Sequence, residues 1–120
     1  MADAVSIQNV NFSYGSNVIL RNFNAQVKRS QIYSLLGPSG GGKTTLLKLI
    51  LGRLTVQQGH ISVLGLPPGR ANSAISFMPQ EIGLCVNFSI NQTFRYFKLV
   101  YQISKEDFYT RRKELCKLVN

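Results

Sequence analysis

The sequence predicts an α/β fold, and three observations support this prediction. Alternating apolar and polar residues near the N-terminus are typical of half-buried strands. A glycine-rich stretch follows a short apolar run and precedes an apolar segment long enough for a helix. The last third of the chain carries two segments with helical periodicity and helix-start signals. The 120 residues suffice for one modest domain and are too few for two.

Two strands are expected at the N-terminus. Residues 5–14, VSIQNVNFSY, alternate between apolar and polar side chains and end at the turn formed by residues 15–17. Residues 18–27, VILRNFNAQV, alternate less cleanly and predict a second strand. We expect the two strands to pair across the turn.

A third strand is expected over Ile32–Leu36, because a continuous apolar run of this length is typical of a strand buried on both faces. This run leads directly into the stretch GPSGGGKTT, Gly37–Thr45, here called the glycine loop. The residues that follow, TTLLKLILGR, are apolar nearly all round and predict a buried helix that Gly52 ends.

Two further strands and two helices complete the prediction. Residues 60–65 predict a strand closed by a Gly-Leu-Pro-Pro-Gly turn, and residues 74–80 predict a short buried strand stopped by a proline. Ser89 has Gln92 three residues later, which is a capping-box signature for the start of a helix. Ser104 and Asp107 repeat this signature and predict a second helix.

Composition excludes some classes of function and leaves others open. The net charge of +9 suits nucleic acid, anionic lipid or phosphate ligands, and equally a solvated basic surface. No stripe of exposed aromatic residues for stacking on bases is visible, so we expect no nucleic-acid partner. No apolar run approaches the roughly 18–20 residues of a membrane helix, and no secretory signal is recognisable. Cys85 and Cys116 follow no metal or redox spacing and are expected to be reduced thiols.

The glycine loop carries the strongest motif. The spacing Gly37-x4-Gly42-Lys43-Thr44 satisfies the P-loop pattern between an apolar strand and a helix. Glycines allow the backbone to aim N–H groups at phosphate oxygens, and the helix adds its positive N-terminal end. We expect Lys43 to lie between the terminal phosphates and the Thr44 hydroxyl to coordinate Mg²⁺. The expected phosphate-binding residues are Gly37, Pro38, Ser39, Gly40, Gly41, Gly42, Lys43, Thr44 and Thr45.

Two residues outside the loop are further candidates. Tyr14 ends the first expected strand and could stack on a purine, a contact worth about 1–3 kcal/mol in other base-stacking sites. The alternative interpretation is an ordinary tyrosine at a strand end. Gln80 ends the expected strand 74–80 and could ligate Mg²⁺ or order an attacking water, or it could be a polar loop residue.

Taken together, these features resemble a known family. Tyr14 in NFSYGS, the loop GPSGGGKTT and Gln80 in ISFMPQEIGL are similar, in order and spacing, to the A-loop, Walker A and Q-loop of ABC-type ATPases. The joint match covers nearly the whole chain. The stretches YSLLGPSGGGKTTLLKLILGR, VLGLPPG and FMPQEIGL most resemble arthropod ABC subfamily H transporters and related G-like transporters.

The resemblance implies a P-loop NTPase fold of the ABC ATPase type. Residues 1–80 would form antiparallel β-subdomain strands and part of the P-loop core, and residues 85–120 would begin the helical subdomain. ATP and Mg²⁺ would be the cofactors: Tyr14 would stack on adenine, Thr44 and Gln80 would hold Mg²⁺, and Gln80 would also sense the γ-phosphate. The implied partners are a second nucleotide-binding domain and the transmembrane domain of a transporter, with this segment on the cytosolic side of the membrane.

The sequence departs from the family pattern after Gln80. It contains no LSGGQ-like signature and no apolar strand ending in Asp-Glu, the pair that would hold magnesium's shell and polarise water. The only histidine, His60, precedes Gln80 and opens a strand, so we interpret it as structural. We therefore expect the first part of a nucleotide-binding domain, which binds ATP without hydrolysing it; Lys43 and Gln80 assist, and the catalytic residues lie elsewhere. The acidic residues are Asp3, Glu81, Glu106, Asp107 and Glu114.

Alternatives to a transporter ATPase remain open at this point. One is an ABC-type ATPase without membrane domains that acts in DNA repair or on the ribosome, with which the net charge of +9 is compatible. Another is a non-catalytic module that regulates by binding nucleotide. A small kinase or GTPase fits worst, because Tyr14 and Gln80 would be unexplained and no Asn-Lys-x-Asp motif occurs.

Overall fold

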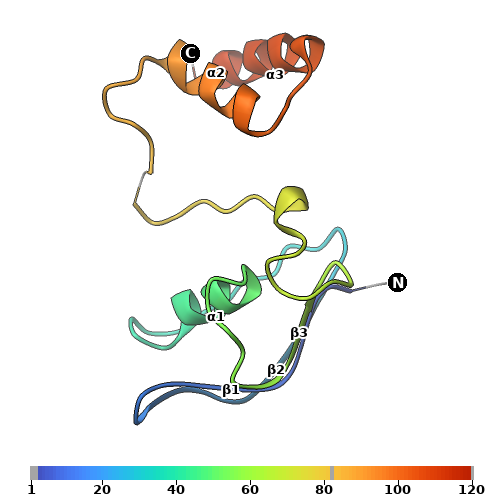
Figure 1. Cartoon of the computed structure of the whole chain (residues 1–120), viewed down its shortest axis with the longest axis vertical. Helices are drawn as coiled ribbons and strands as arrows, with labels where there is room; N and C mark the ends of the chain where they lie inside the picture. The colour runs from blue at the N-terminus through green and yellow to red at the C-terminus, as the bar shows by residue number, and fades with distance from the viewer. Residues whose placement is uncertain (1–2, 82, 120) are drawn as a thin grey trace. The chain divides into compact units, whose positions relative to one another are not determined.

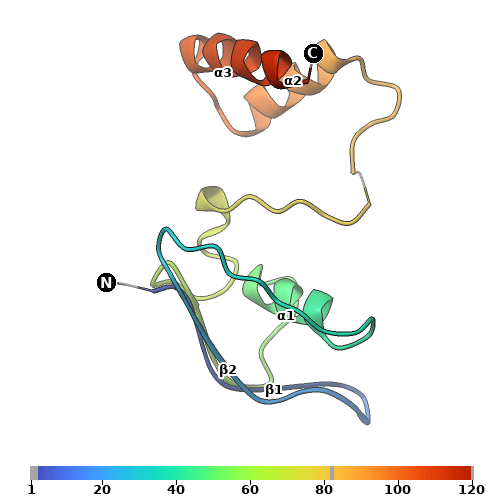
Figure 2. The ribbon, with the colours of Figure 1, turned by 180° about the vertical axis from the view of Figure 1, so that it is seen from behind.

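The computed structural model describes residues 3–81 and 83–119. The chain divides into two compact units, Met1–Ser76 and Phe77–Asn120, here called the first and the second unit. The first unit is a bent β-sheet with a helix over one face, and the second unit is a pair of helices (Figures 1 and 2). None of the helices formed by the described residues is both long and apolar enough to cross a membrane.

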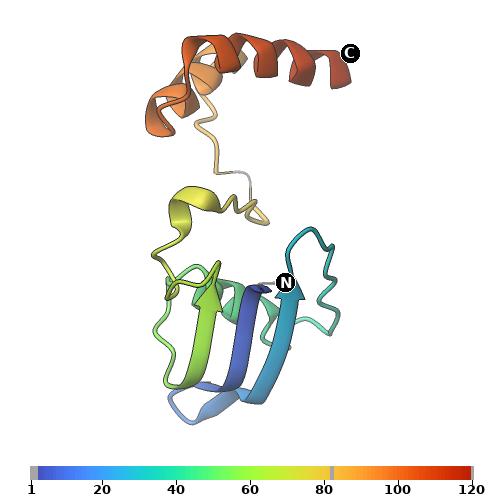
Figure 3. The ribbon, with the colours of Figure 1, turned by 90° about the vertical axis from the view of Figure 1, so that its right-hand side faces the viewer.

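The sheet of the first unit has three antiparallel strands in the order β2-β1-β3 (Figure 3). They are β1 (Asp3–Tyr14), β2 (Asn17–Lys28) and β3 (Gln58–Val63). The predicted hairpin is confirmed, since Tyr14 pairs with Asn17 across a two-residue turn. β3 begins two residues earlier than predicted, where Gln58 pairs with Asn11. It also ends two residues earlier, because Leu64 and Gly65 both have positive φ and turn the chain back.

Helix α1 (Lys43–Ile50) covers one face of this sheet. Leu46 and Leu49 pack into the core, whereas Leu47 is exposed, so the prediction of burial all round the helix is wrong. Only the face of α1 that packs against the sheet is buried, because the helix lies on the surface of the sheet. Gly52 follows it with φ 68° and ends it, as predicted. The buried core residues are Ile7, Val10, Phe12, Leu20, Leu46, Leu49, Ile61, Val63 and Ala71.

The strand predicted over Ile32–Leu36 is not formed. Ile32 is 100% exposed and Leu36 is 89% exposed, and only Leu35 packs against the core. A strand buried on both faces lies inside a sheet and needs a ladder partner on each edge. In the part of the chain that the structure describes, no segment pairs with residues 32–36, so they form no strand.

The strand predicted over residues 74–80 is also absent. A short 3-10 helix, η1 (Asn72–Ala74), occupies its start, and the following residues are irregular. Met78 is exposed, as is Gln80 at the end of the segment. The physical reason is the same, because no described strand lies along this segment to accept its backbone hydrogen bonds.

The second unit contains α2 (Ile90–Val100) and α3 (Lys105–Leu118), both at the predicted positions. The capping box is complete: the Gln92 N–H donates to Ser89 Oγ at 3.3 Å, and the Ser89 N–H donates to Gln92 Oε1 at 2.8 Å. The Asp107 N–H donates to Ser104 Oγ at 3.1 Å and starts α3 in the same way. Both predicted helix starts are therefore confirmed.

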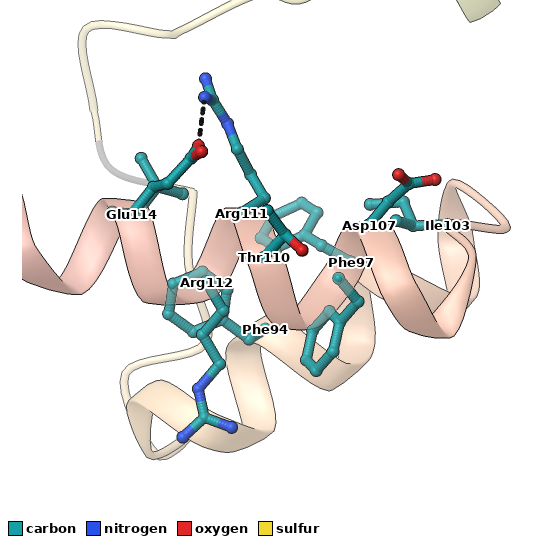
Figure 4. A pocket seen from close by; sticks show the side chains of 10 residues that line it. Phe94, Phe97, Ile103, Asp107, Thr110, Arg111, Arg112 and Glu114 are labelled. Atoms are coloured by element: carbon teal, nitrogen blue, oxygen red, sulfur yellow. Dashed lines mark hydrogen bonds and ion pairs between the residues drawn. The ribbon is translucent and has the colours of Figure 1, made fainter.

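The two helices line an open pocket of about 470 Å³ (Figure 4). Phe94 and Phe97 come from α2, and Phe108 comes from α3, where it is the buried residue of that helix. Arg111 and Glu114 form an exposed ion pair at 3.0 Å on the rim. The pocket is lined by none of the residues predicted to bind nucleotide.

Substitution of Ser89 tests the capping of α2. Ser89→Ala removes the acceptor for the Gln92 N–H, and we expect a loss of about 1 kcal/mol in helix stability. Amide hydrogen exchange at Gln92 and Thr93 should accelerate accordingly. Asn91→Ala is the control, because Asn91 is exposed in the same turn and alanine favours the helix. Equal exchange rates in the two variants would contradict the cap.

Candidate functional site

The backbone of the glycine loop has the conformation that its glycines permit. Gly40 has φ 78° and Gly42 has φ 87°, both in the left-handed region, while Gly41 between them does not. The Gly41 N–H donates to the Pro38 carbonyl at 3.1 Å and closes a tight turn. Left-handed residues at alternating positions are a feature of backbone concavities that bind anions.

A side chain would meet close neighbours at two glycine positions of the loop, most severely at Gly42. A Cβ atom on Gly42 would lie 2.8 Å from Cγ2 of Ile19 on β2, and one on Gly41 would lie 3.0 Å from the Pro38 carbonyl oxygen. Gly42 is buried, and it directly precedes α1 as its N-cap. The end of the glycine loop is therefore fixed against the β-hairpin rather than free in solvent.

Lys43 folds back over the loop. Its Nζ donates to the carbonyl oxygens of Gly37 at 2.6 Å and of Pro38 at 2.5 Å. Both acceptors are neutral, so the positive charge of the half-buried lysine is not cancelled by an anionic partner in these contacts. The structure thus places the lysine ammonium group across the glycine loop.

The first turn of α1 supplies further donors. The Leu46 N–H is bonded to the Gly42 carbonyl at 2.8 Å, and the N–H groups of the first turn before it have no partner within the helix. No acidic residue lies in this turn. Thr44 is exposed, whereas Thr45 is 8% exposed and packs with the core. A phosphate contact from Thr45 would therefore come from its backbone.

Tyr14 lies at the same end of the first unit as the glycine loop. It pairs with Asn17, and Ile19 two residues further along β2 meets the position of Gly42. The hairpin turn and the loop lie on the same side of this unit in Figures 1 and 2. The Tyr14 ring is 47% exposed and contacts Phe12 edge-on, with ring centroids 5.0 Å apart.

Gln80 is described within its own unit. It is exposed, lies in an irregular segment and belongs to the second unit. Tyr14 and the glycine loop both belong to the first unit, and Gln80 belongs to the second. Its predicted roles at Mg²⁺ and at the γ-phosphate remain predictions.

Sequence reasoning missed two residues that position the site. Ile19 packs where Gly42 has no side chain. Gln57 precedes β3, and its side-chain amide makes two bonds to the backbone of Ser13: the Ser13 N–H donates to Oε1 at 2.8 Å, and Nε2 donates to the Ser13 carbonyl at 2.9 Å. Neither contact has a signal in the sequence, because each joins residues more than twenty positions apart.

The histidine, the acidic residues and the cysteines were the remaining residues considered in the sequence. His60 is on β3 opposite Gln8, as expected of a strand residue. Asp3 is the one acidic residue in the first unit, at the start of β1. Across residues 3–81 and 83–119, no three His, Cys, Asp or Glu side chains gather into a metal-binding group. Cys85 and Cys116 are free thiols.

These features fit a polyphosphate ligand. Left-handed glycines shape the loop, the first turn of α1 offers N–H groups, and Lys43 provides a charge. For Mg²⁺, the exposed hydroxyl of Thr44 is a suitable oxygen ligand at the start of the helix. Together with the fold, they define part of a P-loop nucleotide-binding domain.

The family follows from comparison with known proteins. Residues 20–117 match the model of the family described as "ABC transporter", and the chain belongs to this family. The matched range includes the glycine loop and Gln80 and begins after Tyr14. The predicted fold class, a P-loop NTPase of the ABC ATPase type, is confirmed.

Curated proteins with similar sequences also have names that refer to ABC transporters or to export ATP-binding proteins. The chain is 38% identical over 121 residues to ABC transporter G family member 20 of Dictyostelium discoideum, which covers 98% of this chain and 17% of that protein. It is 36% identical over 104 residues to Nod factor export ATP-binding protein I of Cupriavidus pinatubonensis, covering 83% of this chain and 32% of that protein. The chain thus spans about a sixth to a third of the length of these relatives.

Solved structures confirm the fold. An ATP-binding subunit of an ABC transporter superposes with a TM-score of 0.76 over 91% of this chain and 47% of that chain, at 22% sequence identity. CbiO1 of Clostridium perfringens, part of the ABC transporter complex cbiONQ, superposes with a TM-score of 0.53 over 56% of this chain and 27% of that chain, at 26% identity.

Proposed function

We propose that this chain is the ATP-binding portion of an ABC transporter ATPase, in which ATP binding and hydrolysis drive substrate transport across a membrane. One observation carries the proposal: in a chain of the ABC transporter family, a glycine loop closed by Lys43 lies at the same end of the first unit as a half-exposed tyrosine. The loop suits phosphates, and the tyrosine suits a purine.

The residues have distinct roles in this proposal. Gly37–Gly42 and the first turn of α1 hold the phosphates with backbone N–H groups, and Lys43 turns from its carbonyl partners to the terminal phosphates. Tyr14 stacks on adenine. Thr44 and Gln80 hold Mg²⁺, which neutralises phosphate charge when it is bound.

The groups that cleave the terminal phosphate are proposed to lie outside these residues. Asp3 is far along β1 from the turn that carries Tyr14, and the other four acidic residues belong to the second unit. The scarcity of acidic residues in the first unit also favours a second candidate, a module that binds nucleotide and does not hydrolyse it.

The proposed partners are a second nucleotide-binding domain and a transmembrane domain, with this chain on the cytosolic side of the membrane. We also propose the division into a core portion over residues 1–80 and the start of a helical subdomain over residues 85–120. Two relatives named as ABC transporter G family members support a place among the G-like transporters, to which arthropod subfamily H is related.

Titration calorimetry with MgATP tests the proposal. We expect the chain to bind MgATP, and we expect Tyr14→Ala to weaken binding by about 1–3 kcal/mol, the range for stacking one base. Tyr33→Ala is the matched control, because Tyr33 is a 53% exposed tyrosine of the same unit on an irregular segment. Affinity for inorganic tripolyphosphate should be unchanged in both variants, since it has no base.

Absence of binding to both MgATP and tripolyphosphate would refute the proposal. Under both candidates, the chain alone should bind MgATP and release no phosphate. Steady phosphate release that Lys43→Ala abolishes would show that the hydrolytic groups lie within these residues after all.

A further inference from the structure

The sheet of the first unit bends sharply at one level across all three strands. Asn9 on β1 has φ 50°, Asn22 on β2 has φ 43° and Gly59 on β3 has φ 92°. The register of both ladders breaks at this level. A Cβ atom on Gly59 would lie 2.4 Å from the Asn9 carbonyl oxygen, so the strands come very close here. Left-handed residues in a strand interrupt pairing and bend it.

Side-chain amides replace the lost ladder bonds at the bend. The Asn9 N–H donates to Oδ1 of Asn24 at 2.9 Å, and the Asn22 N–H donates to Oδ1 of Asn11 at 2.8 Å. The two bonds are reciprocal, since each left-handed asparagine is held by an asparagine of the opposite strand. They fix the bend from both strands at once.

A third amide holds β1 beyond the bend. Gln57 makes its two bonds to the backbone of Ser13, the residue next to Tyr14, on the edge where β1 has lost β3 as a partner. The side chain thus takes the place of a strand residue. β1 is held by β2 on one edge and by Gln57 on the other up to the position before Tyr14.

The bend carries the end of the hairpin to the glycine loop. Residues 11–20, here called the hairpin tip, lie beyond the bend, and Ile19 and Leu20 of the tip surround the position of Gly42. Figures 1 and 2 show both strands turning toward the side on which the loop lies. A straight hairpin would carry Tyr14 away from the loop.

We propose that Asn11, Asn24 and Gln57, here called the amide clamp, are positioning residues that hold Tyr14 at a fixed place relative to the glycine loop. The clamp thereby sets how strongly the site prefers a purine nucleotide over a polyphosphate without a base. This inference rests on the proposed function, because it assigns the clamp to the same nucleotide site.

The test compares two ligands, MgATP and magnesium tripolyphosphate, in the full chain. In the unaltered chain, ATP should bind about 5- to 100-fold more tightly, the contribution expected of one stacked base. The double variant Asn11→Ala/Gln57→Ala should lose at least about five-fold of this preference and keep its tripolyphosphate affinity. The control is Gln8→Ala/Gln26→Ala, which removes two exposed amides from β1 and β2 outside the clamp.

A pair of substitutions at Asn22 provides an independent check. Asn22→Gly allows the left-handed backbone and should keep the preference for ATP, because glycine adopts positive φ freely. Asn22→Val disfavours that conformation and should lower the preference as the clamp variant does. Both variants keep the clamp side chains, so the comparison isolates the bend.

The outcomes separate the two proposals. An unchanged ligand preference in both the clamp variant and Asn22→Val would overturn the inference and leave the proposed function standing. Equal loss of both ligands would also overturn it, because the clamp would then serve the stability of the whole unit. Failure of the unaltered chain to bind either ligand would refute the proposed function, and the inference with it.

Discussion

Lys43→Ala is expected to lower the affinity for MgATP at least ~100-fold, because each hydrogen bond from a charged group contributes about 1.5–3 kcal/mol. The lysine already lies across the glycine loop, with its Nζ on two carbonyl oxygens, and no large rearrangement is needed to reach a phosphate. Titration calorimetry measures the loss directly. Thermal stability should change little, since the carbonyl oxygens of Gly37 and Pro38 are exposed and can bond water.

Lys48→Ala is the matched control for this substitution. Lys48 lies in the last turn of the same helix, is exposed, and carries the same charge. Its removal subtracts one positive charge from α1 without touching the loop. If the two variants lost the same affinity, the effect would be one of overall charge, and the assignment of Lys43 to the phosphates would be wrong.

Gly42→Ala is expected to destabilise the first unit and to weaken nucleotide binding. The backbone at Gly42 has φ 87°, which costs about 1–2 kcal/mol for an alanine. The added Cβ would also lie 2.8 Å from Cγ2 of Ile19, and overpacking of this kind costs about 1–3 kcal/mol. We expect unfolding free energy and nucleotide affinity to fall together, because the N-terminus of α1 must shift.

Gly65→Ala separates the cost of placing alanine at positive φ from the cost of overpacking. Gly65 has a similar φ of 82°, and a Cβ atom there would meet nothing within 4 Å. Chemical denaturation should show that Gly42→Ala loses more stability than Gly65→Ala by the overpacking cost alone. The combination Gly42→Ala/Ile19→Ala should recover part of the difference. Equal losses in the two single variants would contradict the contact with Ile19.

The elements predicted correctly from the sequence are those specified by neighbouring residues. The β-hairpin follows from alternation on both sides of a glycine turn, and both helix starts follow from a serine with its partner three residues later. Gly52 ends α1 by its own backbone conformation. The glycine loop also belongs to this class, since its motif is nine consecutive residues.

The predictions that were wrong depended on residues far away. Apolar character over Ile32–Leu36 and residues 74–80 predicts a strand only if other strands lie alongside, and the described chain provides none. The contacts of Ile19 and Gln57 could not be predicted from the sequence either, because they depend on how strands distant in the sequence are aligned with one another. The subfamily resemblance was confirmed only as far as G family relatives.

The two carbonyl contacts of Lys43 also bear on which anions the chain can recognise. A ligand that enters the glycine loop competes with bonds that the protein already makes to itself at 2.6 Å and 2.5 Å. A small, singly charged ion such as chloride offers too little in return, whereas a chain of phosphates contacts the lysine and several N–H groups at once. We therefore expect the contacts of Lys43 with its own loop to favour polyphosphates over simple monovalent anions.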